Sequence, residues 1–206
     1  NAGSSAGRED YTVHVLRELG EVVVHGVAIK PGKPVILAVV NDKPVIGLPG
    51  YPVSAYIGFE NFVSPVLAML GDLPLAEKPV IRGVITKRLV SSLKHREYVR
   101  VKIGKVGDKL IAAPLARGAG AAMSLVRADG FCIIPQNSEG LEAGEEAEIE
   151  LYRDLREIEN TLVVIGSHDL ILDVMADLMP ELSQRMYISS THVGSMGGLM
   201  ALKRQE

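Results

Sequence analysis

The strongest constraint on this fold is a pair of segments rich in proline and glycine, because neither can be helical. Residues 28–34 read Ala-Ile-Lys-Pro-Gly-Lys-Pro, and residues 47–55 read Gly-Leu-Pro-Gly-Tyr-Pro-Val-Ser-Ala. Proline lacks an amide donor and fixes φ, while glycine adopts backbone conformations that other residues avoid. Apolar runs at 35–40 and 45–48 lie between them. The pattern predicts short strands joined by rigid turns.

The first segment carries two lysines, Lys30 and Lys33, on this rigid backbone. Paired cations beside a Pro-Gly-Tyr-Pro turn suit an anionic ligand that is held in a fixed orientation. The alternative is a pair of proline-stiffened hairpin turns with solvated lysines. Spacing alone does not decide between the two, because such turn residues are common.

The opening residues form a loop of small residues before an expected helix. Residues 1–10 are rich in glycine, serine and alanine, and the apolar spacing over 11–19 predicts a helix that ends at Gly20. Such a loop lets backbone amides approach a phosphate at the positive end of the helix dipole. Asp10 stands near the helix start, where it either caps the helix or coordinates a divalent cation.

Three motifs in this order amount to a family resemblance. Gly-x-Ser-x-Gly-x-x-Asp-Tyr-Thr begins at Gly3, and the two proline-rich segments follow it at the expected separations. Together they resemble the molybdopterin molybdenumtransferases, a family that includes the E domain of gephyrin. The resemblance covers about residues 1–153. It implies insertion of molybdate into adenylylated molybdopterin with release of AMP.

The resemblance also implies a site, a cofactor and an assembly. Asp10, Lys30 and Lys33 would be the catalytic residues: Asp10 would hold Mg²⁺, and the lysines would neutralise the phosphoanhydride and the oxyanion. Loop residues would cradle the phosphate and shape the cleft, namely Gly3, Ser5, Gly7, Pro49, Gly50 and Pro52. The implied partners are the pterin-nucleotide substrate, the oxyanion and a second subunit, because family sites are completed across a homodimer.

Composition agrees with a soluble protein of the cytoplasm. Hydrophobic residues are 47% of the chain, and a net charge of −3 argues against a general nucleic-acid binder. No apolar run is expected to reach the length that spans a bilayer, so no membrane partner is predicted. The single cysteine, Cys132, lies in an apolar run and is expected to be a buried thiol. The chain lacks an initiator Met and starts inside a motif, so we expect a portion of a longer polypeptide.

The expected fold has three parts of mixed α/β and β class. Residues 1–75 predict the C-terminal part of an α/β molybdopterin-binding layered domain, with a helix from Val53 to about Leu70 that kinks or breaks at Pro65. Residues 76–153 contain short alternating runs that predict a small β-barrel-like domain, as the resembled family has.

Two further residues of this second part are candidate ligands. Arg100 matches an arginine in an aromatic-x-Arg strand pattern of the family, and its alternative is a solvated strand face. Ser124 follows a glycine-rich loop that resembles the segment bordering the pterin cleft, and its alternative is a helix cap.

Residues 160–206 restart an α/β pattern, with a strand, a polar turn and a helix repeated twice. This resembles the start of a periplasmic-binding-protein-like domain, whose hydroxyl-rich turns would hold an oxyanion and which would need further sequence to function. His168 and His192 stand in the two turns, either as ligands or as capping or surface residues.

Departures from the family pattern and rival functions also follow from the sequence. Tyr51 replaces the usual asparagine of Gly-Leu-Pro-Gly-Asn-Pro, so the sequence does not decide between molybdate and tungstate as the oxyanion.

One rival function is that of a non-catalytic pterin or oxyanion sensor. The other is a serine hydrolase, because Gly3 to Gly7 also matches Gly-x-Ser-x-Gly, but it leaves the lysine and proline motifs without a role.

Overall fold

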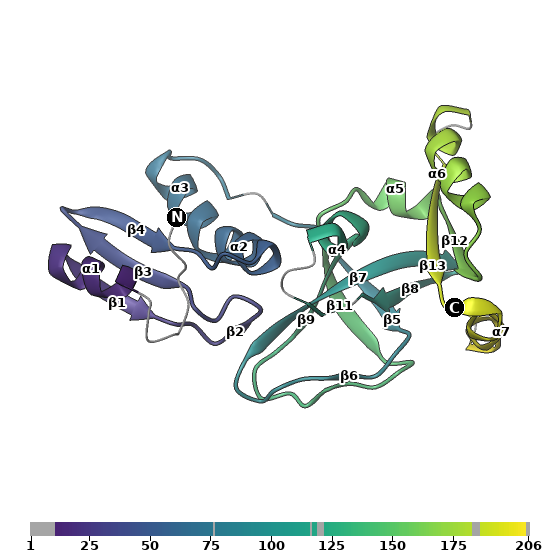
Figure 1. Cartoon of the computed structure of the whole chain (residues 1–206), viewed down its shortest axis with the longest axis horizontal. Helices are drawn as coiled ribbons and strands as arrows, with labels where there is room; N and C mark the ends of the chain where they lie inside the picture. The colour runs from purple at the N-terminus through teal and green to yellow at the C-terminus, as the bar shows by residue number, and fades with distance from the viewer. Residues whose placement is uncertain (1–10, 76, 116, 119–121, 183–185, 205–206) are drawn as a thin grey trace.

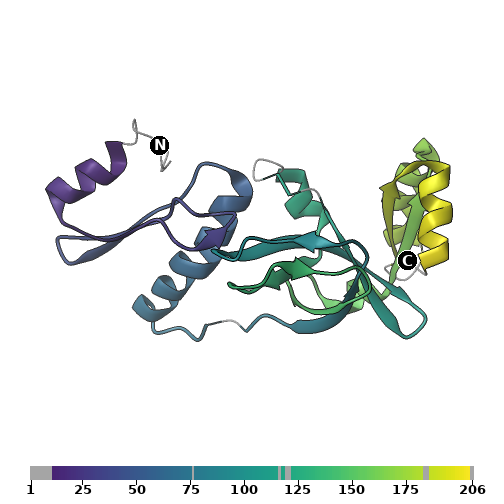
Figure 2. The same ribbon diagram turned by 90° about the horizontal axis from the view of Figure 1, so that it is seen from below.

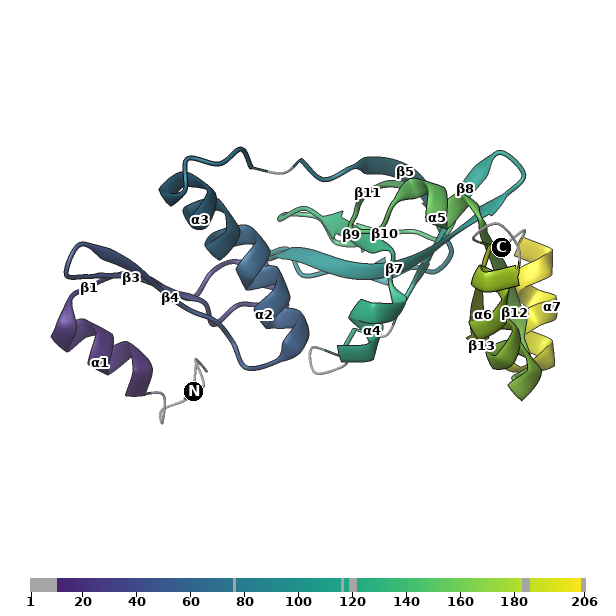
Figure 3. The same ribbon diagram turned by 90° about the horizontal axis from the view of Figure 1, so that it is seen from above.

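The structure, a computed structural model, describes residues 11–75, 77–115, 117–118, 122–182 and 186–204. Its elements form an N-terminal lobe (residues 11–75), a central β-barrel and a C-terminal unit (residues 155–204), as Figure 1 shows. The views from below and above keep the barrel between the other two parts (Figures 2 and 3). The division at residues 75, 153 and 160 stays a prediction, but the class of each part agrees with the mixed α/β and barrel-like architecture that was expected.

The N-terminal lobe is built on a three-stranded antiparallel sheet of order β1-β3-β4. Its first elements are α1 (Tyr11–Leu19), β1 (Glu21–His25), β2 (Ile29–Lys30), β3 (Ile36–Val40) and β4 (Lys43–Gly47). Asn41 and Asp42 both have positive φ, 50° and 59°, and join β3 to β4 as the two-residue turn that suits the twist of a hairpin. Helix α1 covers this sheet with Val13 and Leu16, which pack on Ile36.

A continuous helical segment follows, made of α2 (Pro52–Gly58), a π-helical stretch η1 (Phe59–Val63) and α3 (Ser64–Leu70). A kink or a break was expected at Pro65, and the break does not occur. In the π-helical stretch the N–H of Ser64 donates to the carbonyl of Phe59, five residues earlier. This wider turn lies directly before the proline, whose ring would otherwise press on the backbone one turn earlier.

This segment, Pro52–Leu70, corrects the expectation that no apolar run is long enough to span a bilayer. It has 19 residues with a mean hydropathy of 1.3, and 22% of it is buried. That is a statement of length and composition only. Its middle carries Glu60, which pairs with Lys78 at 2.7 Å, and Asn61, which accepts a hydrogen bond from Tyr98 at 2.8 Å. Because such polar positions are costly inside lipid, we assign the helix to the folded protein.

Five strands close the central β-barrel in the order β7-β8-β5-β11-β9, and β9 pairs again with β7. The elements of this part are β5 (Val80–Ile85), β6 (Leu89–Val90), β7 (Arg96–Val106), β8 (Lys109–Pro114), α4 (Ala122–Arg127), β9 (Gly130–Ile134), β10 (Gly140–Leu141) and β11 (Glu146–Leu151). Strand β7 makes closure possible because its first half pairs with β9 and its second half with β8. This confirms the barrel-like expectation. The two-residue strands β6 and β10 were not predicted, because so short a run has no periodicity.

The interior of the barrel is aliphatic and includes the single cysteine. Val99, Val101 and Ile103 of β7 are at most 2% exposed and pack with Ile149 and Cys132. Burial raises the pKa of the Cys132 thiol to about 11, so it stays neutral. The expectation of a buried thiol is confirmed.

A second, aromatic cluster joins the N-terminal lobe to the barrel. Phe131 on β9 lies 5.9 Å from the ring of Tyr56 and 6.1 Å from that of Tyr98, measured between centroids. Ile29 and Val53 of the lobe belong to the same buried cluster. The lysine-bearing loop is therefore positioned against the barrel by packed rings and not by a flexible linker alone.

The C-terminal unit has the predicted order of strand, helix, strand and helix. Its elements are α5 (Leu155–Glu159), β12 (Thr161–Gly166), α6 (Leu170–Leu182), β13 (Tyr187–His192) and α7 (Gly194–Arg204). The two strands pair in parallel, and Val163 of β12 fills the space that a side chain at Gly104 of β7 would occupy. Helix α6 continues through Pro180 and ends at Leu182. The likeness to periplasmic binding proteins stays a prediction.

We predict that Phe131→Ala destabilises the protein by about 3 kcal/mol, because it removes a ring that is 4% exposed and touches both parts. Phe59→Ala is the matched control, since Phe59 is 42% exposed and its loss should change little. Urea unfolding followed by circular dichroism measures both. Equal losses for the two variants would contradict the role of the aromatic cluster.

Candidate functional site

The predicted lysine loop leaves the barrel edge at β2, which pairs in parallel with β7 so that Lys30 lies opposite Glu97. The N–H of Arg96 donates to the carbonyl of Ala28 at 2.9 Å and holds this short strand in place. Gly32 follows with φ at +113°, and a Cβ there would lie 2.9 Å from the Ile29 side chain. The loop therefore needs glycine at this position for both its conformation and its packing.

One buried carboxylate fixes the first lysine. The side chain of Glu97 is 3% exposed, and its Oε1 lies 3.3 Å from Lys30 Nζ and 3.2 Å from Arg117 Nη1. The hydroxyl of Ser91 donates to its other oxygen at 2.9 Å. Two cations thus face one anion, so the group of three side chains has a net positive charge. The Lys30 side chain is 50% exposed, so part of this charge is accessible to solvent. Such a half-exposed, oriented ammonium suits an anionic ligand.

Lys33 lies on the same loop and is exposed. Its carbonyl accepts the N–H of Val27 at 2.8 Å, and Gly26 donates to Val35 at 2.8 Å, so the loop is closed across its base. Within the described part of the chain, the ammonium of Lys33 makes no ion pair. The loop thus presents one lysine that is held by a carboxylate and one that reaches into solvent.

The second proline-rich segment lies next to this loop. A Cβ at Gly32 would be 3.6 Å from the carbonyl of Ser54, in the first turn of α2. Pro49 is buried, whereas Gly50 and Pro52 are exposed, and Pro52 occupies the first turn of α2. Tyr51, which stands in the place of the expected asparagine, is 64% exposed. The structure therefore brings together the two proline-rich segments that the sequence analysis singled out.

Arg100 does not lie on a solvated strand face, which corrects that alternative. It is 2% exposed, and its Nη1 donates to the carbonyl of Gly118 at 3.1 Å and to the hydroxyl of Ser124. Burial lowers the pKa of this guanidinium from its ordinary value. Ser124 lies inside α4 and not at its cap. In this arrangement both residues hold α4 on the barrel.

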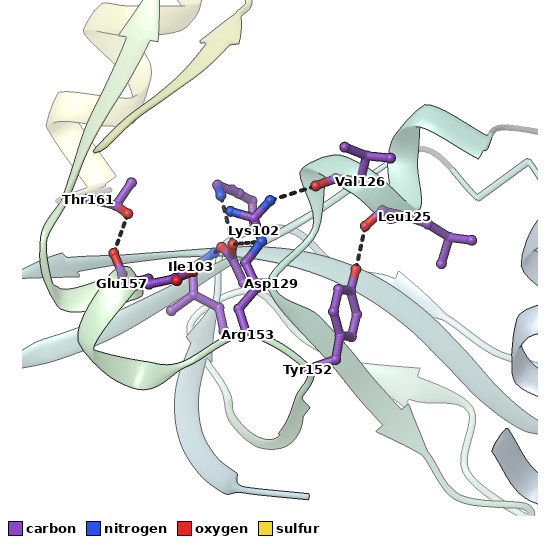
Figure 4. Close-up of polar contacts among 9 residues, drawn as sticks. All are labelled: Lys102, Ile103, Leu125, Val126, Asp129, Tyr152, Arg153, Glu157 and Thr161. Atoms are coloured by element: carbon purple, nitrogen blue, oxygen red, sulfur yellow. Dashed lines mark hydrogen bonds and ion pairs between the residues drawn. The ribbon is translucent and has the colours of Figure 1, made fainter. Parts of the chain in front are cut away.

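Helix α4 is also held from its C-terminal side by a buried carboxylate network (Figure 4). Asp129 accepts from Lys102 Nζ and from the N–H of Ile103, both at 2.7 Å. Beside it, Tyr152 and Arg153 donate to the carbonyls of Leu125 and Val126 at 2.8 Å each. Burial raises the pKa of the Tyr152 phenol, so this hydroxyl remains a donor. The network is structural: it fixes the C-terminal end of α4 on the barrel.

The other predicted site residues, Gly3, Ser5, Gly7 and Asp10, lie outside the described residues. Their roles in phosphate and metal binding stay predictions.

Sequence reasoning missed the two residues that organise the loop, Glu97 and Arg117. The only sequence signal for Glu97 is that it is the one acidic residue of a strand segment, Arg96–Val106, which otherwise carries only basic charges. The partner could not be named from sequence, because Lys30 lies far from Glu97 along the chain.

Two known protein families together match most of the chain. Residues 1–69 match the family described as "Probable molybdopterin binding domain", and residues 82–152 match "MoeA C-terminal region (domain IV)". A Methanocaldococcus jannaschii protein named for molybdopterin biosynthesis is 36% identical over 151 residues, which are 73% of this chain and 35% of that protein. The molybdopterin molybdenumtransferase of Bacillus subtilis is 30% identical over 156 residues, 74% of this chain and 36% of that enzyme. The chain thus spans about a third of the length of these relatives.

Solved structures agree with the sequence relatives. The molybdopterin biosynthesis MoeA protein from Pyrococcus horikoshii aligns with a TM-score of 0.57 and 43% identity, over 70% of this chain and 35% of that one. A molybdenum cofactor biosynthesis protein from Pyrococcus furiosus aligns with a TM-score of 0.56 and 28% identity, over 68% of this chain and 52% of that one.

We predict that Glu97→Gln destabilises the protein by about 2 kcal/mol, because the amide keeps the shape but leaves Lys30 and Arg117 facing no anion. The loss stays below that of a fully buried pair because both cations are partly hydrated. Glu142→Gln is the control: its pair with Arg88 at 2.9 Å is 69% exposed on both sides and should contribute little. Thermal unfolding measures the stability of both variants. If the Glu97 variant were as stable as the control, Glu97 would not be the anion that holds Lys30 and Arg117.

Proposed function

We propose that the full-length protein inserts molybdate or tungstate into adenylylated molybdopterin and releases AMP. The proposal starts from the family, since residues 1–152 of this chain belong to the MoeA family of molybdopterin biosynthesis proteins. The observation that carries the proposal is the rigid loop on which Lys30 is oriented by Glu97 while Lys33 stays exposed beside it. The substrates are polyanions, and the loop offers one cation, Lys30, whose position is set before binding, beside a second, exposed cation, Lys33.

Each described residue has a distinct task in this proposal. Lys30 and Lys33 neutralise the phosphoanhydride and the incoming oxyanion as compact positive charges. Pro49, Gly50 and Pro52 form the adjoining wall, and the missing side chain at Gly50 leaves open space there. Arg100 and Ser124 act indirectly, because they hold the loop of Arg117 that shares Glu97 with Lys30.

Metal and assembly belong to the same proposal. Mg²⁺, when bound, would offset phosphate charge, and Asp10 is its proposed ligand. Glu97 does not suit that task, because two cations already face its carboxylate. We further propose a cytoplasmic homodimer in which a second subunit completes the cleft.

The alternative is a non-catalytic protein that senses a pterin or an oxyanion, and the C-terminal unit, which lies beyond the residues that the two families match, favours it. Incubation of the full-length protein with adenylylated molybdopterin, molybdate and Mg²⁺ separates the two. AMP release in step with cofactor formation is the expected result. Tight pterin binding without AMP would support the sensor, and tungstate in place of molybdate tests the choice of oxyanion.

We predict that Lys30→Ala and Lys33→Ala each lower kcat/KM by on the order of 100-fold, the loss typical of a single charge-stabilising donor. Lys→Arg should fail at one or both positions, because a planar guanidinium does not replace an ammonium on a tetrahedral oxyanion. Lys43→Ala, on the exposed end of β4, is the matched control. Normal turnover by both alanine variants would remove the lysines from the mechanism.

We predict that Asp10→Asn abolishes Mg²⁺-dependent turnover without unfolding the protein, because an amide is a weak ligand for a hard cation. A Mg²⁺ titration of AMP release, read beside a melting curve, measures it. Full activity with a loss of only ~1 kcal/mol in stability would assign Asp10 to helix capping.

A further inference from the structure

The C-terminal unit brings two histidines and an aspartate together at one edge of its sheet. Strands β12 and β13 are parallel and in register, with Gly166 opposite His192, so both strands end at this edge. His168 follows β12 by two residues, and Asp173 lies in the first turn of α6. In open parallel sheets, the carboxyl ends of the strands are where ligands bind.

The two imidazoles face each other through their nitrogens. His168 Nδ1 lies 3.2 Å from His192 Nε2, and the ring centroids are 4.2 Å apart. The Oδ2 of Asp173 lies 4.0 Å from His168 Nε2, and the Ser190 hydroxyl lies 3.1 Å from His192 Nε2. One ligand atom from each of His168, Asp173 and His192 lies within 4.8 Å of the others.

Helix capping does not account for this cluster. The carboxylate of Asp169 accepts the N–H of Ile171 at 2.9 Å, and its carbonyl accepts the N–H of Leu172 at 3.0 Å. Asp169 therefore caps α6, and neither histidine is needed for that task. The cluster is also exposed, so these side chains do not fill a core.

Two imidazole nitrogens at this distance share either a proton or a cation. Around a tetrahedral Zn²⁺ with Zn–N bonds of 2.0–2.1 Å, two ligand nitrogens lie about 3.3 Å apart, close to the 3.2 Å found here. A carboxylate next to two imidazoles supplies the third ligand and an opposing charge. We propose that His168, Asp173 and His192 bind a divalent late first-row transition metal such as Zn²⁺.

This site is separate from the proposed lysine loop, and it lies outside the residues that the two families match. The metal would tie the loop after β12 to the end of β13 and to α6. Because all three ligands are exposed, the fourth coordination position would be open to water or to another small ligand.

Zn²⁺ binding to the full-length, tag-free protein tests the proposal. After removal of bound metal by chelation, isothermal titration calorimetry with Zn²⁺ should show one site per chain. His168→Ala and His192→Ala should each weaken binding by at least about 100-fold, because loss of a residue that only orients a ligand already costs about 10–100-fold. Asp173→Asn should weaken it less. His14→Ala, on the exposed face of α1, is the matched control and should bind as the original protein does.

A second readout keeps the result independent of folding. Co²⁺ in place of Zn²⁺ should give the visible absorption of a four-coordinate site without a thiolate band, because Cys132 is buried in the barrel. Far-UV circular dichroism checks that each variant is folded, and His168→Gln replaces any alanine variant that is not. No Zn²⁺ binding to the original protein, or unchanged binding in folded His168 and His192 variants, would overturn the proposal and leave only a hydrogen bond between two imidazoles.

Discussion

The arrangement of the candidate site depends on the pairing of the two-residue strand β2 with β7. This pairing places Lys30 opposite Glu97 and draws the lysine loop onto the barrel edge. Since the carboxylate is 3% exposed, its burial is tolerable only because Lys30, Arg117 and Ser91 surround it. The same carboxylate thus orients a lysine and fixes the loop that covers Arg100.

Two kinds of contact, aromatic packing and buried ion pairs, hold the parts of the protein together. Aromatic packing around Phe131 fixes the long helix and the lysine loop against the barrel. The buried carboxylates Glu97 and Asp129 then fix the neighbouring loops on the strands. Glu97 pairs with Lys30 of β2 and with Arg117 of the loop before α4. Asp129 binds Lys102 and Ile103 of β7 and lies 3.8 Å from Arg153. Apolar burial supplies most of the stability, and the ion pairs supply position.

Local chemistry made part of this structure predictable. The barrel strands follow from alternating runs bounded by turns, and the lysine loop follows from its prolines and Gly32, whose φ of +113° confirms the need for glycine. The β12–α6 unit follows from an apolar run that ends in a polar turn. Strand β13 was less predictable, because it is largely polar and includes His192, which the sequence analysis placed in a turn. The family resemblance came from motifs at fixed separations, and the family matches confirm it.

The remainder depends on contacts between residues that are distant in sequence. The burial of Arg100 requires α4 above it, and the sequence does not show that a helix folds back onto this strand. Pro65 predicted a kink or a break, but the segment stays helical, with a wider turn directly upstream of the proline. The proximity of His168 and His192 requires the parallel register of two strands, which neither turn reveals alone.

Hydrogen exchange of the full-length protein, followed by mass spectrometry, tests most directly whether β2 is part of the barrel edge. The amide of Arg96, which donates to Ala28 at 2.9 Å, should be protected as strongly as the β7 amides that pair with β9, and without added substrate. In Glu97→Gln this protection should fall while that of the β7–β9 pairs is kept. Rapid exchange at Arg96 in the original protein, at the rate of an open loop, would contradict the dependence of the lysine loop on this pairing.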